Sequence, residues 1–170
     1  MRHLMGLDRQ VPLACLLILR FFFGAYFLSS GWSKLAGGWL GQPVAVTQPT
    51  ARPVLATILD QFAHANPYPL YKRFLLYLVI PREEAFRYLI VFGEMLIGIS
   101  LFTGLATRVG AFFGIFANLN YLLMKGLRSP EAGVDYAFIA GLVTVLLGNP
   151  GRVLGADALL SRKRPLRPLW

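Results

Sequence analysis

VPLACLLILRFFFGAYFLSSGW, residues 11–32, is the stretch that decides the fold. It is almost wholly apolar, and a helix of about 22 residues rises about 33 Å, enough to cross roughly 30 Å of hydrocarbon. Arg20 is the one charged residue within it. The stretch therefore predicts a membrane-spanning helix that carries an arginine inside the bilayer.

Further apolar stretches predict three more spans, at residues 82–103, 107–125 and 130–148. Pro81 stands directly before the first of these, and Glu83 falls in its first turn, where a carboxylate suits the positive end of the helix dipole. Asn149-Pro150-Gly151 ends the last one. We therefore predict an all-α integral membrane protein, a four-transmembrane-helix bundle that forms a single membrane domain over residues 1–170.

The long loop between the first and second spans, residues 33–81, is predicted to hold one or two short amphipathic helices. Apolar residues recur at helical spacing from Val54 to Phe62, and Leu70 to Ile80 forms a second apolar piece after the break at Asn66-Pro67. Each piece is too short to cross a membrane. Two interpretations of the region from Thr50 to Ile80 stay open: helices that lie on the membrane or cap the bundle, and a re-entrant lid.

Composition and charge agree with a membrane protein. The chain has 170 residues, of which 56% are hydrophobic and 15% charged, whereas soluble domains carry roughly 25% charged residues. The net charge is +9, but the basic residues flank apolar stretches and form no stripe of the kind that binds nucleic acid. The lipid bilayer is therefore the expected partner, and nucleic acid is not.

The distribution of basic residues predicts an orientation. The tail, residues 149–170, contains Arg162-Lys163-Arg164, and Arg108 lies in the short turn between the second and third spans. Positive charges mark cytoplasmic segments. We therefore expect a multi-pass protein of the cell (inner) membrane with both termini cytoplasmic and the loop 33–81 extracytoplasmic.

Several chemistries are disfavoured by what the sequence lacks. Cys15 is the only cysteine, so the chain has no internal disulfide and no Cys-x-x-Cys pair. His3 and His64 are the only histidines, and neither lies in an apolar span. We therefore expect no haem and no metal ion, and any electrons in a redox reaction must come from a bound partner or substrate.

Arg20 and Glu94 are the first candidate functional residues. Both fall near the middle of predicted spans that run antiparallel, and a lone charge there costs at least ~2.5–3.5 kcal/mol on insertion scales. We therefore predict an Arg20–Glu94 pair, with Arg87 as a competing, shallower partner for Glu94. The pair is either a structural tie that fixes helix register or the polar wall of a ligand pocket.

Three more polar residues are candidates for the same pocket: Lys34, Asn118 and Asp135. Each has a plainer interpretation, because Lys34 could extend to lipid headgroups, Asn118 could bond a neighbouring helix, and Asp135 could stabilise a helix start. Gly110 and Gly114 indicate close helix packing. Together with Arg20 and Glu94, the three residues predict a polar ligand-binding cluster in the outer half of the bundle.

The chain resembles the DoxX/DoxD family of small bacterial membrane proteins over about residues 15–160. The matching segments are Leu19-Arg20, Gly31 to Leu35, Phe92 to Gly98, Leu101 to Arg108, Asn118 to Tyr121, Asp135-Tyr136 and Arg152 to Asp157. The resemblance implies a four-helix membrane bundle. Members include a subunit of a thiosulfate:quinone oxidoreductase, and others are linked to thiol and oxidative-stress systems. The family pattern provides no catalytic residues that could be assigned to this chain.

The favoured functional hypothesis is a redox-associated, quinone-linked membrane subunit that binds quinone non-covalently, so the chain is at most one subunit of an oxidoreductase. Its partner would be another protein subunit or a second copy of the chain. The first alternative is a non-enzymatic scaffold or assembly subunit of a larger complex. A small-molecule transporter is the third hypothesis, against which the absence of inverted repeats argues.

Overall fold

The computed structural model describes residues 13–37, 39–40 and 61–158, and every regular element within them is helical. The main α-helices are α1 (Leu13–Ala36), α3 (Pro69–Phe74), α4 (Glu83–Thr103), α5 (Thr107–Lys125) and α6 (Ala132–Gly148), and residues 61–65 and 156–158 are helical as well. The helices predicted at 82–103, 107–125 and 130–148 are confirmed to within two residues. The first helix continues beyond Trp32 to Ala36, while residues 11 and 12 lie outside the described part.

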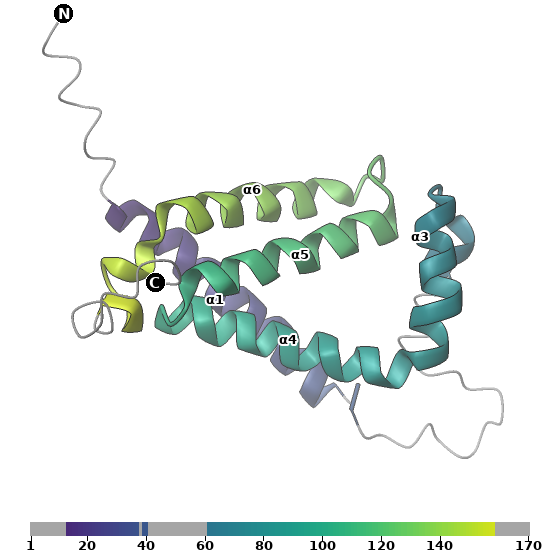
Figure 1. The fold of residues 1–170 in the computed structure, drawn as a ribbon, viewed down its shortest axis with the longest axis horizontal. Helices are drawn as coiled ribbons and strands as arrows, with labels where there is room; N and C mark the ends of the chain where they lie inside the picture. The colour runs from purple at the N-terminus through teal and green to yellow at the C-terminus, as the bar shows by residue number, and fades with distance from the viewer. Residues whose placement is uncertain (1–12, 38, 41–60, 159–170) are drawn as a thin grey trace, which may run out of the picture.

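The four long helices form two antiparallel pairs, α1 with α4 and α5 with α6 (Figure 1). Glycines allow the first pair to approach closely, since a Cβ on Gly24 would lie 2.7 Å from the backbone nitrogen of Phe102. Gly98 of α4 lies in the same way against Leu28 of α1. The glycines of α1 therefore face α4, as small residues at helix interfaces do.

The two pairs meet at one end of the bundle and separate toward the other. Gly104, with φ of +70°, and Ala106, with φ of +51°, form the tight turn that joins α4 to α5. From this turn the two helices diverge, and α3 stands across the gap between them (Figure 1). We call the end with the Gly104–Ala106 turn the turn end, and the end with α3 the open end.

Apolar side chains fill the bundle toward the turn end. The buried residues of this cluster are Phe23, Phe27, Ile97, Leu101, Ala111, Phe138, Leu142 and Val145. They come from all four long helices, and Gly114 of α5 packs on Leu142 of α6 and on Phe27 of α1. The Gly110–Gly114 packing motif predicted from the sequence thus lies at helix contacts, because Gly110 in turn meets Ser100 of α4.

The segment predicted as a separate short helix over Leu70 to Ile80 runs directly into α4. After α3 the chain forms a π-helical turn, Leu75–Val79, and then a 3₁₀ turn, Ile80–Arg82. Pro81 therefore marks a change of helix type instead of a new start. The other predicted amphipathic helix, Val54 to Phe62, lies almost wholly outside the described residues.

Hydrogen bonds hold this segment over the end of α5. The Asn66 side-chain nitrogen donates to the carbonyl oxygens of Leu123 at 2.9 Å and of Met124 at 3.1 Å. The Tyr71 hydroxyl donates to the carbonyl of Asn120 at 3.0 Å. The Leu123 and Met124 carbonyls lie in the last turn of α5, where backbone acceptors lack partners within the helix. The segment therefore caps the bundle, which is one of the arrangements considered from the sequence.

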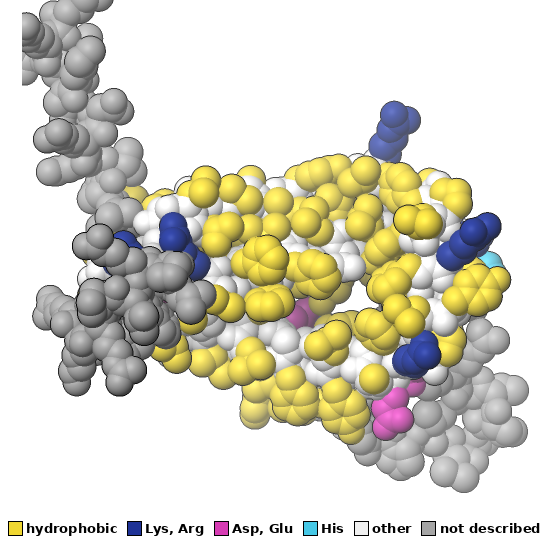
Figure 2. Space-filling view, viewed as in Figure 1, with side chains coloured by type: hydrophobic (Ala, Val, Ile, Leu, Met, Phe, Trp, Pro, Cys, Tyr) yellow, Lys and Arg dark blue, Asp and Glu magenta, His cyan; other side chains and the backbone are white. Residues whose placement is uncertain are grey.

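The outer surface of the helices is strongly apolar, and Figure 2 shows hydrophobic side chains over most of the visible face. Ile18, Leu89, Phe116 and Leu147 are each more than half exposed. Two described stretches are long and apolar enough to cross a membrane, Cys15–Ala36 and Pro69–Thr103, and Ala132–Gly148 is apolar but shorter. Continuous apolar surface of this extent is rare on soluble monomers and suits contact with lipid.

Candidate functional site

A cavity of about 240 Å³ lies between the two helix pairs toward the open end. Its polar lining comes from all four long helices and consists of Ser30, Lys34, Glu94, Asn118, Lys125 and Asp135. Aromatic rings make up much of the remaining wall: Tyr26, Phe27, Trp39, Tyr121 and Phe138. Of the five residues predicted to form a polar cluster, the structure brings four together here, and Arg20 is absent from the lining.

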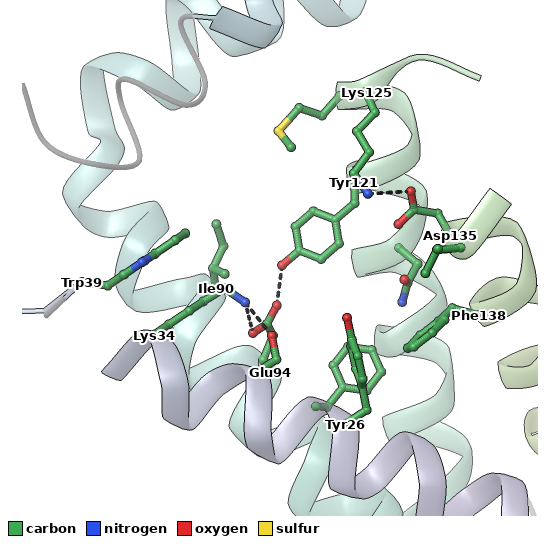
Figure 3. A pocket seen from close by; sticks show the side chains of 14 residues that line it. Tyr26, Lys34, Trp39, Ile90, Glu94, Tyr121, Lys125, Asp135 and Phe138 are labelled. Carbon is green, nitrogen blue, oxygen red and sulfur yellow. Dashed lines mark hydrogen bonds and ion pairs between the residues drawn. The ribbon is translucent and has the colours of Figure 1, made fainter. Parts of the chain in front are cut away.

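Glu94 is the centre of one group of polar side chains in the cavity (Figure 3). It is 3% exposed, and each of its carboxylate oxygens accepts a hydrogen bond. The Tyr121 hydroxyl donates to Oε1 at 2.6 Å, and Lys34 forms an ion pair with Oε2. Lys34 also donates to the Ser30 hydroxyl at 2.7 Å. The buried carboxylate is thus fully paired, as a charge at this depth requires.

A second ion pair, Lys125–Asp135, lies across Tyr121 from the first pair (Figure 3). The Lys125 ammonium is 2.9 Å from Oδ2 of Asp135. Asp135 also lies in the first turn of α6. It is therefore placed to stabilise the start of that helix, as expected from the sequence, and it lines the cavity as well. Side-chain exposure is 20% for Lys34 and 23% for Lys125, against 4% and 5% for their carboxylates. The two ammonium side chains are therefore more exposed than the carboxylates that they pair with, and all four charged groups line the cavity together with the Tyr121 phenol.

Asn118 lines the cavity but does not make the predicted bond to a neighbouring helix through its amide nitrogen. That nitrogen donates to the carbonyl of Gly114, one turn earlier in α5, at 2.8 Å.

Arg87, predicted as a competing partner of Glu94, does not pair with it. It pairs with Glu83 at 3.1 Å and donates to the carbonyl of Trp39 at 2.9 Å.

The predicted Arg20–Glu94 pair is wrong. Arg20 is 1% exposed and lies at the turn end, where its Nη1 donates to the carbonyl of Leu154 and, at 3.5 Å, to that of Pro150. A Cβ on Gly104 would lie 2.6 Å from the same nitrogen. Gly104 follows Glu94 by ten residues, about 15 Å along a helix axis.

The register between α1 and α4 explains the error. Gly24 lies against Phe102 and Gly31 against Met95, so Arg20 faces the turn after α4 and Glu94 faces the end of α1. The prediction placed both residues at mid-span because it assumed that spans 11–32 and 82–103 start and end at the same depth. In the structure α1 extends to Ala36 and α4 has a helical segment before it, which shifts the two helices relative to each other.

Asp157 is the residue at the turn end that sequence analysis missed. Its Oδ1 accepts the N–H of Ala106 at 2.7 Å, and its Oδ2 accepts that of Thr107 at 2.9 Å. It therefore caps the start of α5, a place where free N–H groups favour a carboxylate. Its charge also attracts Arg20. Sequence analysis placed residues 149–170 in a basic tail and therefore gave Asp157 no role in the bundle.

Tyr121 and Lys125 are two polar cavity residues that sequence analysis did not assign to the site. Both could have been predicted from helical periodicity, since positions 118, 121 and 125 fall on one face of a helix. Trp39, by contrast, follows the end of α1, and no periodicity could place it in the cavity.

Within the described residues no group of three side chains is arranged to hold a metal ion.

Lys34, Glu94 and Tyr121 lie in the part of the chain that also carries the likeness to known proteins. A family model described as DoxX matches residues 15–124. The chain belongs to the DoxX family. The match runs from the start of α1 almost to the end of α5 and includes Arg20, Lys34, Glu94, Asn118 and Tyr121. As a DoxX family protein with long apolar helices, it is a membrane protein. The search of solved structures found no match.

Proposed function

We propose that α1, α4, α5 and α6 each cross the cell membrane, with both termini in the cytoplasm and the cavity in the outer half of the bilayer. α5 has 19 residues and α6 has 17, lengths of about 28 and 26 Å that reach across most of the hydrocarbon layer. The exposed apolar side chains on all four helices support this arrangement. So do Arg108 and Arg152, which add positive charge at the turn end.

Labelling of a single cysteine tests this topology. Arg128 is exposed in the turn between α5 and α6, and Cys15 is the only native cysteine. Arg128→Cys in a Cys15→Ala background should react with a membrane-impermeant maleimide in right-side-out vesicles. Arg108→Cys, at the other end of α5, should react only after the vesicles are opened. The reverse pattern would overturn the proposed orientation.

We propose that the cavity binds a quinone head group and that the protein is a redox-associated, quinone-linked subunit of an oxidoreductase system. The arrangement of Lys34, Tyr121 and Lys125 is the observation that carries this proposal. A quinone ring is flat and apolar with carbonyl acceptors on opposite sides, and the cavity combines aromatic walls with donors on different sides (Figure 3). The volume of about 240 Å³ suits a single ring better than a larger cofactor.

Quinone would supply the redox chemistry, because its ring accepts two electrons and two protons. The chain supplies the environment: the Lys34 and Lys125 ammoniums would donate to the acceptor oxygens of the ring, and the Tyr121 hydroxyl, which donates to Glu94, would hold a proton beside a bound ring. The electrons must come from a donor outside the chain, either a partner subunit or a reduced substrate. This requirement makes a partner protein part of the proposal.

Equilibrium binding tests the proposal directly. Protein in lipid nanodiscs is titrated with decylubiquinone, and binding is followed by quenching of tryptophan fluorescence, which Trp39 in the cavity wall should report. Lys34→Gln and Lys125→Gln should each weaken binding about tenfold, the loss of roughly one charge-assisted hydrogen bond. Lys72→Gln, a lysine of α3 outside the cavity lining, is the matched control and should bind like the wild type.

The same preparations separate this function from the scaffold alternative. Mass spectrometry of gently purified protein should find copurified quinone. Absence of quinone, together with no saturable quenching and a protein partner in fixed stoichiometry, would instead identify a structural subunit.

A further inference from the structure

The cavity opens through the side of the bundle. Figure 2 shows a hollow between α4 and α5, bordered by the segment that contains α3, with an acidic side chain visible inside. Ile90 of α4 and Met124 of α5 belong to the cavity lining and lie on the two helices that border this hollow. The surrounding surface is apolar, since Leu89 and Phe92 of α4 are 65% and 48% exposed.

The route along the bundle axis is covered. Leu75 and Val79, 2% and 5% exposed, form a buried cluster on the segment that follows α3. Trp39, Ile90 and Met124, all part of the cavity lining, pack against that cluster. A ligand arriving from water at the open end would have to displace this packed layer, whereas the hollow between α4 and α5 leads to the apolar side.

We propose that the ligand of this cavity is a lipid-tailed amphiphile that enters from the bilayer between α4 and α5, with its apolar tail lying over Ile90 and Met124 while its polar head meets the two lysine pairs. This rests on the proposed quinone-binding function and names the tail as a second determinant of binding. A tailed quinone dissolves in the lipid beside the opening between α4 and α5 and can reach the cavity from there, whereas a quinone without a tail partitions far less into lipid.

Two quinones that share one head group separate the contributions of head and tail. Decylubiquinone carries a ten-carbon tail, and 2,3-dimethoxy-5-methyl-1,4-benzoquinone has none. In nanodiscs, with affinities expressed against the total quinone concentration, the wild type should bind the tailed compound at least about tenfold more tightly, because the tail concentrates it in the lipid beside the opening. Ile90→Trp, which places a larger side chain at the rim, should remove most of this preference and change affinity for the tail-less compound less than about threefold.

Variants at other positions test whether the ligand enters between α4 and α5. Met124→Trp approaches the same hollow from α5 and should act like Ile90→Trp if both fold. Val134→Trp fills the opposite side of the cavity, where Val134 of α6 is 59% exposed, and it should leave the tail preference intact. Leu147→Trp, on the outer surface of α6 away from the cavity, is the control for a bulky exposed ring.

The outcomes distinguish this inference from the proposed function. Equal affinity for the two quinones in the wild type, or a selective loss of tail preference in Val134→Trp in place of Ile90→Trp, would overturn the α4–α5 entrance while leaving the quinone site intact. No binding of either compound would instead reject the quinone site itself, and the entrance with it.

Discussion

The two ends of the bundle both bury charged residues, but they bury them differently. At the turn end, Arg20 is held by the carbonyls of Pro150 and Leu154, and Asp157 caps α5, with backbone packed closely around both. At the open end, Lys34–Glu94 and Lys125–Asp135 border a cavity, and each ammonium remains partly exposed to it.

We propose that this contrast separates charges that hold the fold from charges that serve ligand binding. The Arg20 guanidinium and the Asp157 carboxylate bond to backbone of loops that connect helices, so their partners are fixed by the fold and no space is left for a ligand. The charges at the open end pair side chain with side chain and leave donors facing a cavity. A buried charge in a membrane helix is thus a sign of function mainly where there is space beside it.

The largest expected effect is at the turn end. Arg20→Met should lower the free energy of unfolding by about 3–5 kcal/mol, because it leaves Asp157 and the carbonyls of Pro150 and Leu154 without their cationic partner. Thermal unfolding in detergent measures the change. Arg128→Ala, at an exposed arginine, should stay within about 0.5 kcal/mol of the wild type. A stable Arg20→Met protein that has lost quinone binding would reverse the assignment of the two ends.

A pair of glycine substitutions tests how tightly the turn end is packed. Gly104→Ala should cost about 2–4 kcal/mol, since φ there is +70° and the added Cβ would lie 2.6 Å from Arg20 Nη1 and 2.8 Å from the Cα of Gly155. Gly93→Ala is the matched control inside α4, where nothing lies within 4 Å of a new Cβ. It should be neutral or slightly stabilising in the same unfolding assay. Similar losses in both variants would show that the turn end is not specially packed.

Glu94→Gln should have the opposite profile, a modest effect on stability and a clear effect on binding. Lys34 loses its charged partner but keeps the Ser30 hydroxyl and the cavity, so we expect a loss of only about 1–2 kcal/mol in unfolding free energy. Quinone affinity should fall about tenfold, because Lys34 and Tyr121 lose the group that orients them. Asp157→Asn is the comparison: it should destabilise the fold and leave the affinity of the folded protein unchanged. Equal profiles for the two variants would remove the distinction between the ends.

The helices were predictable because the residues that start, extend and end each helix lie within its own stretch of sequence. Apolar runs of span length, the Gly104 turn and the Asn149-Pro150-Gly151 break set their boundaries, and the structure agrees to within two residues for α4, α5 and α6. The continuous course from α3 into α4 was not predictable from Pro81, since a proline is tolerated in the first turn of a helix as well as at a break.

Only some of the residues that line the site could be predicted from the sequence. Helical periodicity places Lys34, Glu94, Asn118 and Asp135 on inward faces, but it does not determine how far one helix is displaced along another. That displacement depends on which glycines meet which side chains, and here it separates Arg20 from Glu94. Trp39 lies in a turn after α1, and Asp157 lies in a short helical stretch after α6, so both fall outside the long apolar helices whose periodicity places side chains.

Tyr121→Phe gives the smallest expected effect and the finest test of the open end. Glu94 would keep its ion pair with Lys34 and lose only the 2.6 Å bond from the phenol, so we expect about 1 kcal/mol or less in stability and a fall in quinone affinity of no more than about fivefold. Tyr136→Phe removes a hydroxyl that bonds the carbonyl of Leu127 outside the cavity and should leave affinity unchanged. If Tyr121 passes a proton to the bound ring, a quinone-reduction assay with the partner present should slow by far more than the affinity falls. A rate that declines only in proportion to affinity would make Tyr121 a positioning residue for Glu94.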